Sequence, residues 1–433
     1  MEITVKKSEP LKGVIEIPAD KSITHRAFLF SMLTKGRCRI KNFSKGKDCM
    51  SSLNAVQQLG CTVEYINENE LIIDAPKILK KPDRAVDCGN SGTAARIISG
   101  ILAGQNFNTV LTGDESLSKR PMKRIIEPLE LMGAEIVHND FKLPLEIKGL
   151  QGASRLLKGI DYVSPLASAQ VKSCILAAGL FADGAVSFTE PYQSRNHTEL
   201  MFKYMGADIN VCGNKVSIKK SSLNPADITI CGDISSAAFF ITAALLVPGS
   251  DILIKNTGIN ETRNGIIEIY KKMNADIEIL NERIVSNEKT ADIRVRYSNL
   301  KSAEIKGALI PRLIDEIPVI ALAASQAEGE TVIKDAADLR NKESDRIKTI
   351  AFELNKLGAD ITETPDGLVI RGKTPIKGGC VSECCHDHRI AMTEYIAGLI
   401  SINPVSIKEF QWTDISFPEF LTLFAKLSRG CRS

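Results

Sequence analysis

The segment Lys356-Leu357-Gly358-Ala359-Asp360-Ile361 contains the end of one predicted helix and the start of one predicted strand. Its glycine can adopt the left-handed conformation that ends a helix. The residues after it alternate between apolar and polar, as in a half-buried strand, and a second apolar segment follows at Leu368-Val369-Ile370. The pattern therefore predicts a unit of helix, strand, turn and strand.

The same pattern occurs in four further places, roughly 70 to 85 residues apart. They are Leu59-Gly60-Cys61-Thr62-Val63, Met132-Gly133-Ala134-Glu135-Ile136, Met205-Gly206-Ala207-Asp208-Ile209 and Met273-Asn274-Ala275-Asp276-Ile277. A sixth copy is expected to be split between the chain ends, with its helix at 417–427 and its strands at 3–5 and 14–17. We therefore expect one α/β domain formed by 1–20 plus 233–433 and containing both termini, and a second domain formed by 21–232.

The composition of the chain limits the classes of function and the compartment that we expect. The chain has 433 residues, a net charge of +3 and eleven cysteines without a regular framework. Such a small charge gives no support for nucleic-acid binding, and any positive site must be local. The cysteine pattern is typical of reduced cytosolic thiols. No signal peptide or membrane span is apparent, so we expect a cytoplasmic protein.

Seven predicted helix starts carry cations, hydroxyls or amides. Cations are disfavoured at a helix N-terminus unless an anion is held there by the side chains and free N–H groups. The repetition of this feature indicates one ligand with several anionic groups, or two anionic ligands. The seven are Lys21-Ser22-Ile23-Thr24-His25-Arg26, Asn90-Ser91-Gly92-Thr93-Ala94-Ala95-Arg96, Arg120-Pro121, Ser168-Ala169-Gln170-Val171-Lys172, Ser194-Arg195-Asn196-His197, Arg340 to Arg346, and Asp387-His388-Arg389. At the third, Pro121 is expected to be the first helical residue.

Acidic residues are scarce in these segments. Asp315-Glu316 precedes an apolar helix, where the pair either caps that helix or accepts a proton from a substrate hydroxyl. Glu343 lies within the cationic segment as a second candidate acid or base. The run Cys384-Cys385-His386-Asp387-His388 lacks the spacing of a zinc site, so no metal is expected. Phosphate-loop and dinucleotide fingerprints are absent, which argues against ATP and NAD.

At these residues the chain resembles the EPSP synthase family of enolpyruvyl transferases, which are 3-phosphoshikimate 1-carboxyvinyltransferases. The resemblance is collinear over nearly the whole chain, and its most specific parts are Asn90-Ser91-Gly92-Thr93 and Lys342-Glu343-Ser344-Asp345-Arg346. It implies a two-domain inside-out α/β barrel with three helix-strand-strand repeats in each domain and the active site in the cleft between them. It also implies transfer of the enolpyruvyl group of phosphoenolpyruvate to the 5-hydroxyl of shikimate 3-phosphate, with no cofactor and with a monomeric chain.

The resemblance also implies roles for individual residues. Those expected to bind shikimate 3-phosphate are Lys21, Ser22, Arg26, Ser168, Gln170, Ser194, Arg195, Asp315 and Lys342. Those expected to bind phosphoenolpyruvate are Lys21, Gly92, Arg120, Gln170, Arg346 and Arg389. Proton transfer is expected from Asp315 and Glu343, with Lys21 as a further catalytic residue, and the sequence does not assign each carboxylate to a half-reaction.

One segment departs from the family pattern. Some members carry a lysine shortly before the C-terminal Phe-Pro, whereas this chain has Asp414-Ile415-Ser416-Phe417-Pro418. A contact to phosphoenolpyruvate is therefore missing or is made elsewhere.

Three alternatives share some of these features. The sister transferase acting on UDP-N-acetylglucosamine has Lys-Asn in place of Lys21-Ser22 and a cysteine in the loop before its Arg-Pro, which the segment 113–120 lacks. RNA phosphate cyclase has repeats of this general kind, but its catalytic histidine motif is not apparent here. A non-catalytic binder of anions would gain nothing from Asp315 and Glu343.

Overall fold

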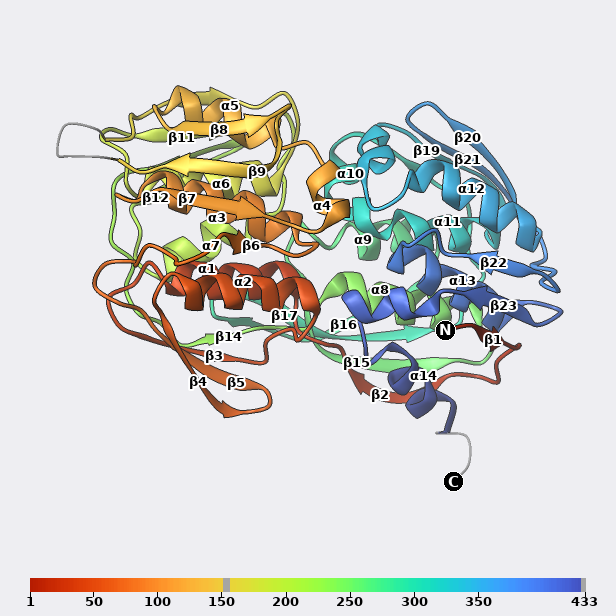
Figure 1. Ribbon diagram of the computed structural model, residues 1–433. Helices are drawn as coiled ribbons and strands as arrows, with labels where there is room; N and C mark the ends of the chain where they lie inside the picture. Colours follow the sequence, from red (N-terminus) through yellow and green to blue (C-terminus); the bar gives the residue numbers. More distant parts are fainter. Residues whose placement is uncertain (151–155, 430–433) are drawn as a thin grey trace. The chain divides into compact units, whose positions relative to one another are not determined.

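The computed structural model describes residues 1–150 and 156–429. The chain forms two compact units (Figure 1). Unit 1 consists of Met1–Pro18, Cys231–Ile284 and Lys289–Ser433, and unit 2 consists of Ala19–Ile230 and Val285–Glu288. The tip of the hairpin at 285–288 therefore belongs to unit 2, whereas the sequence-based boundaries assigned it to the other domain. Among the described residues, no helix is long and apolar enough to cross a membrane.

Unit 2 contains three four-stranded sheets of identical topology. Each begins with a parallel pair and continues with two antiparallel neighbours. In spatial order the strands are β14 (Ile228–Thr229), β3 (Arg37–Lys41), β5 (Glu70–Asp74) and β4 (Thr62–Asn67); β6 (Val86–Asp87), β7 (Thr109–Thr112), β9 (Lys142–Lys148) and β8 (Glu135–Asn139); and β10 (Asp161–Val163), β11 (Val186–Thr189), β13 (Lys215–Ile218) and β12 (Ile209–Cys212).

Each sheet of unit 2 is accompanied by one buried helix and one amphipathic helix. The buried helices are α1 (Lys21–Ser31), α3 (Gly92–Ala103) and α6 (Ala169–Gly179), and the amphipathic helices are α2 (Lys47–Gln58), α5 (Lys123–Leu131) and α7 (His197–Tyr204), with the short α4 (Glu115–Lys119) before α5. The close approach of α3 and α6 depends on Gly100, where an added Cβ would lie 2.0 Å from the carbonyl oxygen of Cys174. The first residues of α1, α3 and α6 carry the predicted anion-binding groups.

Unit 1 repeats this plan with two four-stranded sheets and one three-stranded sheet. The strands are β18 (Glu304–Ile305), β19 (Gly329–Ile333), β21 (Gly367–Gly372) and β20 (Asp360–Thr364); β2 (Lys12–Glu16), β15 (Asp251–Gly258), β17 (Glu288–Arg296) and β16 (Asp276–Val285); and β22 (Val381–Glu383), β23 (Val405–Lys408) and β1 (Ile3–Val5).

The helices of unit 1 follow the same division. The buried ones are α8 (Ile234–Leu246), α11 (Ile317–Ser325) and α13 (His388–Ile400). The others are α9 (Gly265–Lys272), α10 (Ile310–Leu313), α12 (Arg346–Leu357) and α14 (Phe420–Arg429), with 3-10 turns η1 (Gly307–Leu309), η2 (Ile314–Glu316), η3 (Ala337–Asn341) and η4 (Phe410–Ile415). This is the predicted inside-out arrangement, because the apolar helices form the core of each unit.

The five predicted helix-ending positions all adopt a left-handed backbone. Their φ angles are +96° at Gly60, +91° at Gly133, +86° at Gly206, +68° at Asn274 and +112° at Gly358. A hairpin follows each of them: β4–β5, β8–β9, β12–β13, β16–β17 and β20–β21. The prediction of five helix, strand, turn and strand units is confirmed.

Two local predictions were wrong. Strands β1 and β2 do not pair with each other, because β1 runs antiparallel to β23 whereas β2 runs parallel to β15 in a different sheet. The sixth copy therefore has a single terminal strand. Pro121 does not begin a helix, since α4 ends at Lys119 and α5 begins at Lys123, so Arg120 lies in the connection between them.

Candidate functional site

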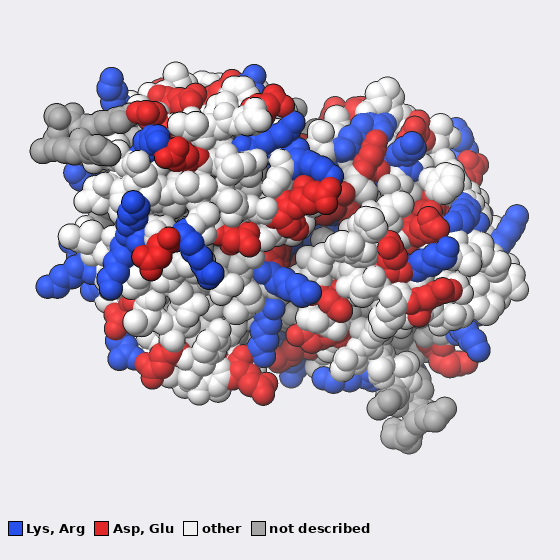
Figure 2. Space-filling view, viewed as in Figure 1, with Lys and Arg blue, Asp and Glu red and all other residues white. Residues whose placement is uncertain are grey.

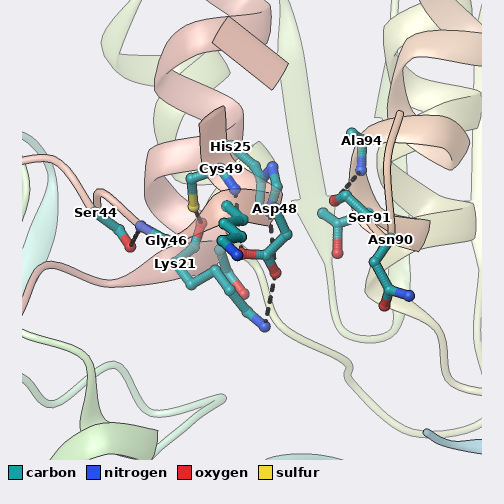
Figure 3. A network of polar contacts seen from close by, with 12 residues as sticks. Lys21, His25, Ser44, Gly46, Asp48, Cys49, Asn90, Ser91 and Ala94 are labelled. Carbon is teal, nitrogen blue, oxygen red and sulfur yellow. Dashed lines mark hydrogen bonds and ion pairs between the residues drawn. The ribbon is translucent and has the colours of Figure 1, made fainter. Parts of the chain in front are cut away.

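Unit 2 carries the first cluster of predicted site residues, at the start of α1. Lys21 is the first residue of this helix, and its ammonium lies 3.1 Å from a carboxylate oxygen of Asp48 in the first turn of α2 (Figure 3). Figure 3 shows His25 and Cys49 beside the same carboxylate. Asp20 caps the helix by accepting a hydrogen bond from the N–H of Ile23 at 2.8 Å. Lys21 is thereby held at a helix start where its charge would otherwise be unfavourable.

His25 remains neutral in this cluster. Burial lowers the pKa of its imidazole to about 4, although the carboxylate of Asp48 opposes the shift. One nitrogen, Nδ1, lies 2.7 Å from the Ser52 hydroxyl, and Nε2 lies 4.0 Å from Asp48. The donor atoms of His25, Asp48 and Cys49 lie within 4.8 Å of one another, a spacing that a metal ion could bridge. The ammonium of Lys21 already provides positive charge at this carboxylate, so we interpret the group as support for Lys21.

Arg26 lies deeper in the same helix and is completely buried. Its guanidinium donates to the Thr198 hydroxyl at 2.7 Å, the Ser173 hydroxyl at 2.7 Å and the carbonyl oxygen of Ser22 at 2.9 Å. Burial lowers the pKa of Arg26 to about 10, and the nearby Glu199 opposes this change. Arg26 therefore links α1 to α6 and α7 through its hydrogen bonds.

Ser22 and Arg195 lie together. The guanidinium of Arg195 donates to the Ser22 hydroxyl at 3.3 Å, across 173 positions of sequence. Ser194 precedes Arg195 in the loop before α7, and its buried hydroxyl has no hydrogen-bond partner among the described residues. Ser168, a further predicted ligand, accepts from the N–H of Val171 at 3.4 Å and caps α6.

A second network in unit 2 surrounds the start of α3. Arg96 donates to the Gln170 side-chain oxygen at 2.6 Å, and Gln170 donates to the Thr93 hydroxyl at 2.9 Å. Gly92 leaves room for this guanidinium, because a Cβ there would lie 2.9 Å from its Nη1 atom. Arg120 donates to the side-chain oxygen of Asn90 at 3.0 Å. Three predicted ligands, Gly92, Gln170 and Arg120, thus belong to the group formed by α3, α6 and the 120–122 connection.

Unit 1 carries the other cluster, which is centred on the guanidinium of Arg346 at the start of α12. Arg346 is 1% exposed and donates to Asp387 from Nε at 2.7 Å and from Nη2 at 3.2 Å. It also donates to Glu343 at 2.6 Å and to Asp315 at 3.4 Å. Burial alone would lower the pKa of Arg346, but Asp387 and Glu343 outweigh it and raise the pKa. Arg346 therefore stays charged.

The two predicted acid–base carboxylates therefore share one cation. Lys342 adds a second, because its ammonium lies 3.7 Å from Asp315 and 3.6 Å from Asp338. The pKa of Asp387 stays below its usual value although burial opposes ionisation, because Arg346 lies against it. Asp387 therefore serves as the permanent counter-ion, and Asp315 and Glu343 are the more exposed members of the cluster.

Two further cations of the predicted anion site, Arg340 and Arg389, have protein partners of their own. Arg340 donates to Asp345 at 2.8 Å and to the carbonyl oxygens of Thr364 and Pro365, so it joins η3 to the end of β20. Arg389, at the start of α13, is nearly buried and lies 3.9 Å from Glu316. Figure 2 shows Lys and Arg interspersed with Asp and Glu on the face drawn, without a broad patch of either sign.

Sequence reasoning did not identify the carboxylates behind these cations. Asp48 and Asp387 contact Lys21 and Arg346, but each is also a residue that commonly begins a helix, and a cap and an ion-pair partner have the same sequence signature. Arg96 is expected from the sequence only to add positive charge at its helix start, and it is not assigned to either substrate. The only available signal was its position one turn after the Asn90-Ser91-Gly92 loop.

Comparison with known proteins identifies the family of this chain. The family model for EPSP synthase (3-phosphoshikimate 1-carboxyvinyltransferase) matches residues 5–424. The 3-phosphoshikimate 1-carboxyvinyltransferase of Thermoanaerobacter sp. (strain X514) is 49% identical over 429 residues, which cover 99% of this chain and 100% of that protein. The protein of the same name from Thermodesulfovibrio yellowstonii is 51% identical over 437 residues, with 99% and 100% covered.

Solved structures also match this chain. EPSP synthase from Acinetobacter baumannii matches with a TM-score of 0.88 at 42% identity, covering 98% of each chain. The enolpyruvyl transferase NikO from Streptomyces tendae matches with a TM-score of 0.79 at 16% identity, covering 98% of this chain and 96% of that one, which supports the fold alone. This chain therefore belongs to the EPSP synthase (3-phosphoshikimate 1-carboxyvinyltransferase) family.

Proposed function

We propose that this protein transfers the enolpyruvyl group of phosphoenolpyruvate to the 5-hydroxyl of shikimate 3-phosphate, and so acts in the shikimate pathway of aromatic amino acid biosynthesis. The observation that carries the proposal is the pair of carboxylates on one guanidinium, with Glu343 at 2.6 Å and Asp315 at 3.4 Å from Arg346. The relatives bear the name of this enzyme over essentially their whole length.

The addition step requires two proton transfers, and the elimination step requires the removal of one proton. In the addition step, the 5-hydroxyl oxygen bonds to C2 of phosphoenolpyruvate, the hydroxyl proton passes to a base, and an acid delivers a proton to the methylene carbon. In the elimination step, the bond from C2 to the phosphate oxygen breaks and a proton leaves the methyl carbon. Asp315 and Glu343 are the groups that we assign to these transfers, because a carboxyl group serves as acid when protonated and as base when ionised.

The cationic groups have a different task. Both substrates are anions, and arginine and lysine bind phosphate and carboxylate oxygens with charge-assisted hydrogen bonds. We assign Lys21, Ser22, Arg26, Ser168, Gln170, Ser194, Arg195, Asp315 and Lys342 to shikimate 3-phosphate, and Lys21, Gly92, Arg120, Gln170, Arg346 and Arg389 to phosphoenolpyruvate. Lys21 also takes part in catalysis, by stabilising charge that develops on the reacting oxygens.

The buried guanidinium groups need a rearrangement to take part in binding. Every guanidinium nitrogen of Arg346 and of Arg26 already donates to a protein partner. We propose that a substrate oxygen replaces one of these contacts when Glu343 or Ser173 turns away. We further propose that the protein is a cytoplasmic monomer. The ten described cysteines are all free thiols, which agrees with a reducing compartment; Cys431 lies outside the described residues.

Phosphate release tests the proposal. The chain is incubated with phosphoenolpyruvate and either shikimate 3-phosphate or UDP-N-acetylglucosamine, and inorganic phosphate is measured. We expect release with shikimate 3-phosphate alone, and a loss of about 10²-fold or more in kcat for Glu343→Gln, since positioned acid–base groups typically contribute about that much. Glu330→Gln on β19 makes the same change on a half-exposed side chain and should leave kcat unchanged.

Either contrary result has a clear meaning. Release with the nucleotide sugar would assign the chain to the sister transferase. Binding of both anions without release from any substrate pair would leave a non-catalytic binder.

A further inference from the structure

The loop that carries Ser194 and Arg195 is held by a lysine that the reaction itself does not use. Lys172 projects from α6 and is completely buried. Its ammonium lies 2.8 Å from Glu190 at the start of the loop, 3.2 Å from the carbonyl oxygen of Ser194 within it, and 2.7 Å from Glu199 in the first turn of α7. The Lys172 side chain therefore contacts the loop between β11 and α7 at two points and the first turn of α7 at a third.

Glu190 makes the second contact to the same turn. Its Oε1 atom accepts the Ser194 N–H at 2.9 Å as well as the ammonium of Lys172. The N–H and the carbonyl oxygen of Ser194 are thus both fixed by one buried ion pair. Hydrogen bonds to charged groups are among the stronger ones in proteins, and burial leaves them little screened by water.

Unlike the backbone of Ser194, its side-chain hydroxyl is available to a ligand. The Ser194 hydroxyl is buried and has no partner among the described residues, although buried hydroxyls are usually hydrogen-bonded. Arg195 follows directly and donates to Ser22 at the start of α1. Because the N–H and the carbonyl oxygen of Ser194 are both bonded and its hydroxyl is unused, this residue is suited to bind an oxygen of an anionic substrate.

We propose that Lys172 and Glu190 are positioning residues for shikimate 3-phosphate: their buried ion pair fixes the backbone of Ser194 so that its hydroxyl and the guanidinium of Arg195 bind that substrate. This inference rests on the proposed function. Glu199 is the natural comparison, because it pairs with the same ammonium and is equally buried, yet its oxygens make no hydrogen bond to the loop or to any other described residue.

The matched variants are Glu190→Ala and Glu199→Ala, and each leaves Lys172 with one carboxylate. Steady-state phosphate release is used for two measurements. The first gives the KM for shikimate 3-phosphate. The second, at saturating shikimate 3-phosphate, gives the KM for phosphoenolpyruvate. We expect Glu190→Ala to raise the first KM about tenfold or more and the second less than about twofold. Glu199→Ala should leave both KM values within about twofold, although it also removes one of the two buried carboxylates that pair with Lys172.

A purely structural role would change both variants alike. The inference would be overturned if the KM for shikimate 3-phosphate rose equally in the two variants, or rose in neither. In that case phosphate release by the wild type would still support the proposed function. A wild-type chain that releases no phosphate would overturn both. If an alanine variant does not fold, Glu190→Gln and Glu199→Gln keep the side-chain volume, and Glu190→Gln is then expected to raise the KM for shikimate 3-phosphate more than Glu199→Gln does.

Discussion

Glu394 should make unit 1 less stable as the pH rises. This residue of α13 is 1% exposed. Burial raises the pKa of its carboxyl group from 4.5 to about 8; the Ser382 hydroxyl opposes the shift and the charge of Glu353 adds to it. Glu353 itself accepts from the Ser382 hydroxyl at 2.8 Å and from the backbone N–H of Glu383 at 3.2 Å, so two carboxyl groups share a small buried space between α12, α13 and β22.

The sign follows from proton binding. Below pH 4.5 both the folded and the unfolded chain hold the proton on Glu394, and the group has no effect. Between pH 4.5 and about 8 the unfolded chain releases it and the folded chain keeps it, so the free energy of unfolding falls as the pH rises. Above pH 8 the loss is constant at about 5 kcal/mol, and the part that accrues between pH 6 and pH 8.5 is about 2.5 kcal/mol.

Glu394→Gln removes this titration and keeps the shape of the protonated group. We expect the variant to gain about 2.5 kcal/mol over the wild type between pH 6 and pH 8.5, whatever its stability at either pH alone. Urea unfolding at the two pH values measures this gain. Fluorescence of Trp412, the single tryptophan of the chain, reports on unit 1, which also contains Glu394.

The control is Glu383→Gln, which removes a nearby half-exposed carboxylate. It should retain most of the wild-type pH dependence, because the charge of Glu383 is a smaller cause of the raised pKa of Glu394 than burial. Parallel pH dependence in the wild type and in Glu394→Gln would refute the reasoning, since it would mean that Glu394 binds protons equally in the folded and the unfolded chain.

Two further predictions concern unit 2. Gly100→Ala should destabilise the chain by about 3 kcal/mol or more in urea unfolding, because the new Cβ would lie 2.0 Å from the carbonyl oxygen of Cys174 and force α3 from α6; a loss under 1 kcal/mol would show that the two helices separate freely. Asp48→Asn should lower kcat/KM about tenfold in the phosphate-release assay, because the ammonium of Lys21 loses a charged partner at 3.1 Å; unchanged kcat/KM would show that Lys21 is positioned without Asp48.

The repeat could be predicted from sequence because its signals are local. The left-handed residue after a helix, such as Gly358 with a φ of +112°, leaves a direct signature in composition. The buried helices were equally clear, since α8 and α11 have apolar residues on every side. These features depend only on residues within a few turns of one another.

The errors concern long-range pairing and helix boundaries. Strand β1 is three residues long, and its partner β23 lies some four hundred positions away, so nothing in the segment itself distinguishes β23 from β2 as a neighbour. Proline at position 121 suits a helix start but also the turn that separates α4 from α5, and the backbone preference is the same for both.

The site was predicted as a set of cations, and the carboxylates were underestimated for a physical reason. Burying a charged group without a counter-charge is costly, so a cation that lies in the protein interior before the substrate arrives is usually paired with a carboxylate. Arg346 has Asp387, and Lys172 has Glu190 and Glu199. Acidic residues near a cationic helix start therefore do not argue against an anion site; they are what allows the cations to be buried before the substrate arrives.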